Sequence, residues 1–469
     1  MGWAIENAPA LMCGTLVLLI LSGLPVAFAL AATGAGWIFI GILSGAMEPA
    51  LFGLLPSRVF GIISNEMLLA IPFFTFMGLV LERSGIAEDM LRAFGQLFGQ
   101  VRGGLAVAVV LVGAVIAATT GVVAAAVTAI GLVSLPVMLR HRYSPTLTMG
   151  TIAAAGTLAQ IIPPSLVLII LAEQLGVSVG DIYTAAVGPG LCLVALYVLY
   201  VMVVGWLFPA SAPPVPEEEN AGAGGPLLLR AAASLVLPTI LIAIVLGSVL
   251  AGLATATESG ALGAVGVAGL GLVRRRLSRD VIRSVLEQTV RLSSSILLII
   301  VGASTFALGL YAFDGADWVS AQFGALPGDV RVFLAVVCLA IFVLSFFLDF
   351  FEIAFVVVPL LVPTAAALGV DNVWLGVLIA LVIQTAFLHP PFGIAIYVLR
   401  SLAPTKDYPD PKSGRTIPAV ANRAIYVGAI PFIVLQVLIV AALIWFASPA
   451  AEPATAAPPL RLELPAPPA

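Results

Sequence analysis

Charged side chains are scarce in this chain. Only 9% of its 469 residues are Asp, Glu, Lys or Arg, whereas hydrophobic residues make up 61%. A soluble domain carries about 25% charged residues. The shortage of charge excludes a soluble globular protein and indicates an all-α polytopic membrane protein, for which the lipid bilayer is the partner and no nucleic-acid partner is expected.

Residues that build catalytic or metal centres are also few. The three cysteines, Cys13, Cys192 and Cys338, lie far apart in apolar runs and match no metal, redox or disulfide spacing. The two histidines, His141 and His389, are too few for a metal centre. Nucleophile-elbow, zinc-protease and phosphate-loop motifs are absent from the sequence. We therefore expect no enzyme activity, no cofactor and no ATP-driven step within this chain.

Apolar segments of membrane-spanning length follow one another along the chain. About 20 apolar residues cross the hydrocarbon core of a bilayer as a helix. No basic residue precedes the first segment, which favours a retained helix over a secretion signal. Ten spans are expected, at about residues 10–31, 34–55, 61–82, 146–173, 183–207, 231–253, 259–273, 292–312, 372–400 and 426–447.

Two further apolar segments have polar residues near their centres. The segment 104–139 contains Thr-Thr-Gly at 119–121, and the segment 331–368 contains Asp349 and Glu352. Each is slightly short for two full crossings and a turn. We interpret both as re-entrant helical hairpins that enter and leave on one side of the membrane, and the alternative is a pair of cramped full spans in each segment.

A double proline interrupts an apolar run in each half of the chain, in GTLAQIIPPS at 156–165 and in QTAFLHPPFG at 384–393. Proline has no N–H, so the carbonyls four residues before each proline lose their helical donors. Lipid cannot satisfy such carbonyls, and a broken helix at membrane depth is tolerated only beside protein or a wet cavity. A simple proline kink is the plainer reading of either run taken alone.

The two double prolines belong to a longer repeat. The shift in numbering that carries Pro163 onto Pro390 also carries the lone proline Pro136 onto Pro363, so each lone proline precedes its double proline by the same interval. The pattern of apolar segments follows the same shift. Broken helices at matching places in two halves are typical of the binding site of a secondary transporter.

The placement of Lys and Arg predicts the orientation. With the N-terminus outside, 17 of the 20 basic residues fall on one side and only Arg58, Arg331 and Arg461 on the other. The side rich in Lys and Arg is the cytoplasmic one. Both termini are therefore expected outside.

The same topology predicts the domains. Five spans and one hairpin per half make the second half an inverted copy of the first. The first repeat covers 1–208, a cytoplasmic linker 209–229, the second repeat 230–447 and a disordered tail 448–469. Two amphipathic segments, 86–100 and 278–291, flank spans and are expected to lie in the membrane interface as anchors, or else to act as levers between a fixed and a moving part.

Polar residues inside the membrane are candidate site residues. Asp349 and Glu352 are expected to face one cavity from the outer hairpin tip, or else to meet water at the membrane edge. His389 either donates to substrate or satisfies a freed carbonyl with its neutral ring. Thr119, Thr120 and Gly121 form the inner tip, where small residues let carbonyls approach a ligand or simply favour helix packing.

An ordered series of motifs from about residue 10 to 447 resembles a known family, the large membrane subunit of tripartite ATP-independent periplasmic (TRAP) transporters. The matching pieces are LLAIPFFTFMG (68–78), GTLAQIIPPSL (156–166), VGPGL (187–191), TATESGALGA (255–264), VVVPLLVP (356–363) and HPPFGI (389–394).

The resemblance implies an elevator-type, sodium-coupled importer of small organic acids in a bacterial inner membrane, with both termini in the periplasm. It also implies two partners, a small four-helix membrane subunit and a periplasmic substrate-binding protein. The residues expected near substrate are Thr119, Thr120, Gly121, Thr157, Asp349, Glu352, Gln384 and His389. Those expected near sodium ions are Thr120, Gly121, Gly156, Pro163, Ser165, Asp349, Thr385 and Pro390.

Two other functions stay open on the sequence. One is a stand-alone sodium- or proton-coupled carrier or antiporter of the same superfamily, in which Asp349 and Glu352 handle protons. The other is a membrane-embedded enzyme that uses the same acidic pair, although the short loops leave little room for a catalytic domain.

The topology is directly testable. Single cysteines replacing Leu277 and Ala316 are expected to react with an impermeant maleimide from opposite sides of the membrane, Leu277→Cys from the cytoplasm and Ala316→Cys from outside. Labelling of both positions from one side would end the argument for an inverted repeat.

Overall fold

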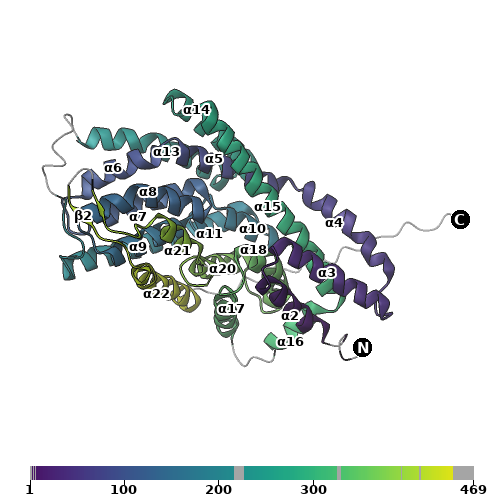
Figure 1. Cartoon of the computed structure of the whole chain (residues 1–469). Helices are drawn as coiled ribbons and strands as arrows, with labels where there is room; N and C mark the ends of the chain where they lie inside the picture. Colours follow the sequence, from purple (N-terminus) through teal and green to yellow (C-terminus); the bar gives the residue numbers. More distant parts are fainter. Residues whose placement is uncertain are drawn as a thin grey trace.

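The structure is a computed structural model that describes residues 3, 5, 7–215, 227–324, 329–391, 393–410 and 414–446. The described part is almost entirely helical (Figure 1). Its only strands are β1 (Tyr408–Pro409) and β2 (Thr416–Ile417), which pair as a short antiparallel ribbon. The all-α prediction is confirmed.

The first half of the chain begins with helices that lead to the first hairpin. These are α2 (Ala8–Leu21), α3 (Val26–Leu43), η1 (Pro49–Gly53), α4 (Leu54–Ile63), η2 (Glu66–Leu69), α5 (Ala70–Arg83) and α6 (Ile86–Phe98). The hairpin and the broken helix follow as α7 (Gly104–Thr120), α8 (Val123–Arg140), α9 (Pro145–Thr157), η3 (Leu158–Gln160), α10 (Leu166–Leu175) and α11 (Val179–Leu207).

The second half repeats this order. It starts with α13 (Leu227–Leu250), α14 (Ala256–Val273), α15 (Arg279–Ala312) and α16 (Gly315–Gly324). Its hairpin and broken helix are α17 (Val330–Leu344), α18 (Phe350–Glu352), the π-helical turn η4 (Ile353–Val357), α19 (Val358–Ala367), α20 (Asn372–Ala386), α21 (Ile394–Leu402) and α22 (Asn422–Phe446).

The shift that carries Pro163 onto Pro390 relates the helices of the two halves closely. It carries α8 onto 350–367, the span of α18, η4 and α19, and it carries the first residue of α9 onto Asn372, the first residue of α20. The repeat seen in the prolines therefore extends to the helices. The exact domain bounds at 208 and 230 stay a prediction, and residues 216–226 of the linker and 447–469 of the tail lie outside the described part.

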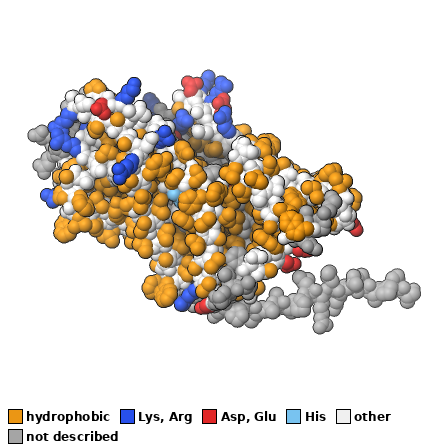
Figure 2. Space-filling view, turned by 60° about the horizontal axis from the view of Figure 1, so that its bottom comes forward, with side chains coloured by type: hydrophobic (Ala, Val, Ile, Leu, Met, Phe, Trp, Pro, Cys, Tyr) orange, Lys and Arg blue, Asp and Glu red, His pale blue; other side chains and the backbone are white. Residues whose placement is uncertain are grey.

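Seven described helices are long and apolar enough to cross a membrane, and an eighth span is possible where η1 and α4 meet η2 and α5 at an angle of 49°. Figure 2 shows hydrophobic side chains across the middle of one face, with Lys and Arg gathered mainly along its upper and left margins. A band of this kind is what lipid contact requires. A membrane protein with several spans is thus confirmed.

The first two expected spans, 10–31 and 34–55, are wrong in their bounds. The structure ends α2 at Leu21 and begins α3 at Val26, so the expected break at 32–33 lies inside a helix. Gly23 has a φ of 87°, and Pro25 caps α3. The helix-breaking Ser-Gly-Leu-Pro sequence ends the helix there, although apolar neighbours hide it in a hydropathy count.

The amphipathic segment 278–291 is not a separate interfacial helix. It forms the first turns of α15, a single helix of 34 residues that continues into the expected span 292–312. No proline or glycine separates the two parts, so nothing ends the helix at Arg291. The other amphipathic segment, at 86–100, does form its own helix, α6, which packs against α7 and α13.

The two halves are interleaved rather than side by side. Helix α3 packs along α15, and α14 packs along α5; Figure 1 shows α15 running diagonally past these elements. In the same way α9 packs against α22, and α11 against α20. Each half therefore completes the core of the other, and neither can bury its apolar faces alone.

A bidentate ion pair ties the first hairpin to the ribbon. The Arg140 guanidinium, at the end of α8, donates to both carboxylate oxygens of Asp410 at 2.8 and 3.1 Å. Asp410 is only 3% exposed, so the pair is largely removed from water. The ribbon lies in the long connection 403–421 between α21 and α22, whereas the equivalent connection of the first half, between α10 and α11, is only the short turn 176–178. The ribbon is thus an addition of the second half that steadies the base of the first hairpin.

The crossing of α9 and α22 depends on glycine. A Cβ atom added to Gly150 would overlap the carbonyl oxygen of Gly428, and one added to Gly428 would overlap the carbonyl of Thr146. Small residues let helix backbones approach in this manner inside membranes.

Replacing Gly150 by alanine is expected to destabilise the protein by about 2 kcal/mol, because the helices must separate to admit the methyl group. Thermal unfolding in detergent measures the effect. Gly247→Ala is the matched control, since nothing lies within 4 Å of a Cβ at that helical position. Equal stability of the two variants would contradict the close crossing.

Candidate transport site

The tip of the first hairpin rests on the broken helix of its own half. Gly121 ends α7 with a φ of 57°, and a Cβ added to it would lie 3.2 Å from the backbone nitrogen of Leu166, the first residue of α10. The structure thus brings together two segments, 119–121 and 156–165, that contain residues expected near substrate and sodium from the family resemblance. Thr119 and Thr120 are the last residues of α7, and their side chains lie outside the described part.

Two of the four carbonyls freed by the double prolines have gained another donor. Pro164 removes the helical donor of the Gln160 carbonyl, and the hydroxyl of Ser165 donates to that carbonyl at 2.7 Å. Pro391 removes the helical donor of the Phe387 carbonyl. That carbonyl accepts instead from the backbone N–H of Ala395 at 3.2 Å. The expectation of open carbonyls therefore fails at these two positions, because the start of the next helix supplies a donor. A carbonyl oxygen has a second lone pair, so an additional cation contact stays compatible.

The acidic pair at the outer tip begins a helix. The Asp349 carboxylate accepts from the N–H of Phe351 at 2.6 Å, and the Glu352 carboxylate accepts from the N–H of Asp349. This reciprocal arrangement is a capping box, which satisfies backbone donors that the first turn leaves without partners. Glu352 is 1% exposed. The pair thus has a structural role that the sequence analysis did not assign to it.

His389 joins the outer tip to the second break. One ring nitrogen, Nε2, lies 3.1 Å from the hydroxyl of Ser345 at the end of α17, and Nδ1 lies 3.3 Å from the carbonyl of Pro390. The ring stacks on Phe346 with centroids 4.1 Å apart. The Pro390 carbonyl is not one of the carbonyls that the double proline frees, so both roles expected for His389 stay predictions.

A hydrogen bond links equivalent positions of the two halves. The amide of Gln384 donates to the hydroxyl of Thr157 at 3.2 Å, and the repeat carries one of these residues onto the other. Residues of a repeat that touch their own counterparts lie on its internal axis. Both are completely buried. Within the described residues, the side-chain oxygens of Gln384 and of the nearby Gln160 have no hydrogen-bond partner.

The remaining candidates lie around these breaks. Thr385 is buried, and its hydroxyl donates to the Val382 carbonyl at 2.6 Å. Gly156 lies where α9 meets α8, because a Cβ there would overlap Val127. Pro163 is buried, whereas Pro390 is exposed. None of these contacts assigns a ligand, and the sodium and substrate positions stay predictions.

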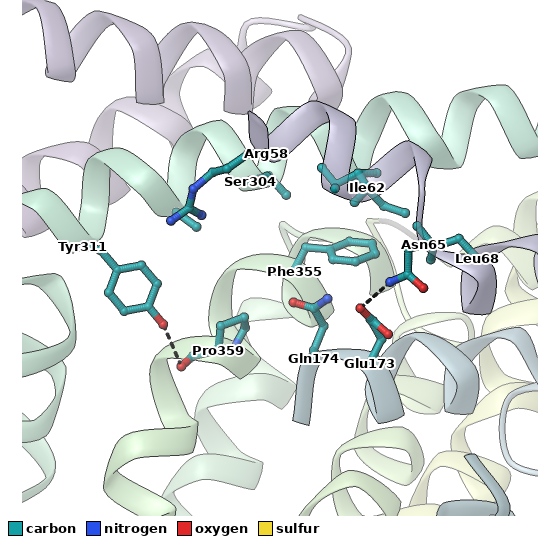
Figure 3. Close-up of a pocket in the computed structure, with 14 residues that line it drawn as sticks. Arg58, Ile62, Asn65, Leu68, Glu173, Gln174, Ser304, Tyr311, Phe355 and Pro359 are labelled. Atoms are coloured by element: carbon teal, nitrogen blue, oxygen red, sulfur yellow. Dashed lines mark hydrogen bonds between the residues drawn. The ribbon is translucent and has the colours of Figure 1, made fainter. Parts of the chain in front are cut away.

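A cavity of about 330 Å³ lies on one side of the outer hairpin. Figure 3 shows Arg58 from α4 with Ser304 and Tyr311 from α15 at one end, and Asn65 with Glu173 at the other. Gln174 of α10, Phe355 of η4 and Pro359 of α19 close its floor. The cavity is within the range of small-molecule sites. Its lining includes none of the residues predicted to contact substrate.

Two hydrogen bonds hold the cavity wall together. The amide of Asn65, in the bend between α4 and η2, donates to the carboxylate of Glu173 in α10 at 2.7 Å. The hydroxyl of Tyr311 donates to the Pro359 carbonyl over a long 3.5 Å. Pro363 removes the helical donor of that carbonyl, so the tyrosine takes the place of the missing N–H.

Sequence reasoning missed these lining residues because they are brought together only by the fold. Asn65 and Glu173 are 108 residues apart in the chain. One signal was present: Arg58 is one of only three basic residues on the predicted outer side. An arginine against the charge bias of its own side is a candidate for a specific role.

Comparisons with known proteins agree on one family. Residues 13–448 match the family described as tripartite ATP-independent periplasmic transporter, DctM component. A C4-dicarboxylate TRAP transporter large permease protein of Pseudomonas aeruginosa is 31% identical over 76% of this chain and 83% of its own. A sialic acid TRAP large permease of Vibrio cholerae is 26% identical, covering 81% and 86% of the two chains. An ectoine TRAP large permease of Halomonas elongata is also 26% identical, covering 82% and 88%.

The fold has a solved counterpart. The crystal structure of the Alcanivorax borkumensis YdaH transporter superposes with a TM-score of 0.62, covering 92% of this chain and 97% of that one. Sequence identity is 14%, so this similarity concerns the fold alone.

Substitution separates two roles of Asp349, its capping of α18 through an acceptor oxygen and any role of its negative charge. Asp349→Ala removes the cap of α18 and is expected to cost about 1 kcal/mol of stability, whereas Asp349→Asn keeps an acceptor oxygen and stays near wild type. Thermal unfolding in detergent compares the two. If Asp349→Asn lowers the stability as much as Asp349→Ala does, the negative charge itself is needed, and capping by an acceptor oxygen does not explain the role of Asp349.

Proposed function

The chain belongs to the family of the DctM component of tripartite ATP-independent periplasmic transporters, and from this premise we propose that it carries out sodium-coupled import of a small organic acid. It acts as the large membrane subunit in a bacterial inner membrane. The observation that carries the proposal is the paired architecture of hairpin tips set against helix breaks, seen at Gly121 with Leu166 and at Ser345 with His389.

This arrangement suits transport because it places irregular backbone and polar side chains in the protein interior. Broken helices at corresponding places in two repeats are the usual location of substrate and ion sites in secondary transporters. The hairpins meet the breaks on packed surfaces, so a substrate held at a tip can move with the hairpin and its broken helix. An elevator-type movement of this unit against α3–α5 and α13–α15 is part of the proposal.

Sodium is favoured as the coupling ion by the available ligands. A dehydrated hard cation prefers oxygen ligands and does not need a titratable group. The side-chain oxygens of Gln160 and Gln384 are buried and have no hydrogen-bond partner among the described residues. Unpartnered buried oxygens are costly unless something else binds them, and a sodium ion near the two breaks would do so.

An organic acid is favoured as the substrate by the relatives. Their names specify C4-dicarboxylates, sialic acid, 2,3-diketo-L-gulonate and ectoine, which all carry carboxylate groups. The family description implies three components. A small membrane subunit and a periplasmic substrate-binding protein are therefore proposed as partners of this chain.

The experiment is uptake into proteoliposomes with sodium and proton gradients imposed separately. With the small subunit and the binding protein present, uptake of an organic acid that the binding protein binds is expected only with an inward sodium gradient. Omission of either partner should abolish it. Full uptake on a proton gradient without sodium would overturn the sodium coupling. Robust uptake by this chain alone would favour a stand-alone carrier.

A further inference from the structure

We propose that Arg58 binds the carboxylate of the transported acid in the cavity beside the outer hairpin, and that Glu173 excludes a second carboxylate from its other end. The substrate class is then an acid with one carboxylate and a hydroxyl or ammonium group opposite. This inference rests on the proposed transport of organic acids and adds the selectivity of the cavity.

The Arg58 guanidinium is available for a ligand. Its side chain is exposed and lines the cavity, and no hydrogen bond, ion pair or ring contact engages it within the described residues. Arginine presents a planar fork of N–H donors that matches a carboxylate in a two-bonded geometry. Ser304 and Gln174 add neutral hydrogen-bonding groups along the same cavity. Among the described residues that line the cavity, Arg58 is the only basic one.

Glu173 gives the opposite end a negative charge. Its carboxylate accepts from Asn65 at 2.7 Å, but an amide is neutral and leaves the charge uncompensated. Figure 3 shows the Asn65–Glu173 pair and the Arg58 side chain at opposite ends, with Gln174 and Phe355 between them. A dicarboxylate that reached Arg58 would therefore bring its second carboxylate toward Glu173, and like charges repel.

The cavity also bridges the parts that would have to move. Arg58 and Ser304 belong to α4 and α15, whereas Glu173 and Phe355 belong to the broken helix and the outer hairpin. A ligand bound between the two sets is released when they separate. A carboxylate on Arg58 would therefore couple occupancy to the relative position of the hairpin.

The charge of the cavity is tested with a cysteine in place of Ser304, a nearly isosteric change. The probes are an anionic and a cationic methanethiosulfonate added from outside at low ionic strength, and the unmodified protein gives the background rate. Arg58→Ala, and separately Arg58→Gln, is expected to lower the ratio of anionic to cationic labelling about five-fold, because a nearby positive charge acts oppositely on the two probes. Arg58→Lys should retain the ratio. Ala316→Cys is the control, and its ratio should not respond to Arg58.

Selectivity is tested by protection of the same cysteine. Gluconate, with one carboxylate and several hydroxyls, is expected to slow labelling about three-fold or more, and succinate, with two carboxylates, is not. Glu173→Gln should let succinate protect as well. Equal protection by both acids with Glu173 intact would overturn the exclusion, and an unchanged labelling ratio in Arg58→Ala and Arg58→Gln would overturn the role of Arg58.

Uptake by the complete three-component transporter separates this inference from the proposed function. Arg58→Ala is expected to lower the maximal uptake rate at least ten-fold while leaving the half-saturating concentration of binding protein unchanged. Arg331→Ala, on the same predicted side, is the control with normal uptake. A change in the half-saturating concentration alone would make Arg58 a docking residue instead. Normal uptake by Arg58→Ala would refute the inference and leave the function standing, whereas no acid uptake by wild type would refute the function.

Discussion

A backbone carbonyl without a donor cannot remain in lipid, and this constraint organises the structure around its prolines. Among the carbonyls that lose their helical partners to proline, those of Gln160, Phe387 and Pro359 have each gained another donor: a serine hydroxyl, a backbone N–H from the next helix and a tyrosine hydroxyl. Each substitute donor comes from another segment. The breaks are therefore points where separate helices are joined.

This explains which parts of the site were predictable. A double proline in an apolar run has a definite local meaning, so the breaks at Pro163 and Pro390 and their repeat followed from the sequence. Their pairing with the hairpin tips was implied only by the family resemblance. The donors that fill the freed carbonyls, such as Ala395, depend on how the chain resumes after the break. The sequence shows Asp349 and Glu352 as an acidic pair at the outer tip, but the pair alone does not show that both carboxylates bond to the backbone as a capping box.

Two other features escaped prediction for different reasons. The turn at Ser22–Pro25 was not predicted because hydropathy is averaged over a window of residues, and a short interruption barely changes the mean hydropathy of the window. The cavity could not be predicted because its walls come from α4, α10, α15 and the outer hairpin. No local sequence pattern indicates contacts between segments so far apart in the chain. Tertiary proximity of Arg58, Asn65 and Glu173 is a property of the packed repeats rather than of any one segment.

The repeat relates the charged residues of the cavity to residues of the other half. In transporters built from inverted halves, the two halves exchange roles at the two faces of the membrane. The shift that carries Pro163 onto Pro390 carries Arg58 onto Val285 and Glu173 onto Arg400. An aliphatic side chain thus replaces the cation, and a cation replaces the acid. The equivalent positions of the second half therefore carry a cation where the cavity has its acid, and a ligand matched to the cavity would meet a different set of charges there.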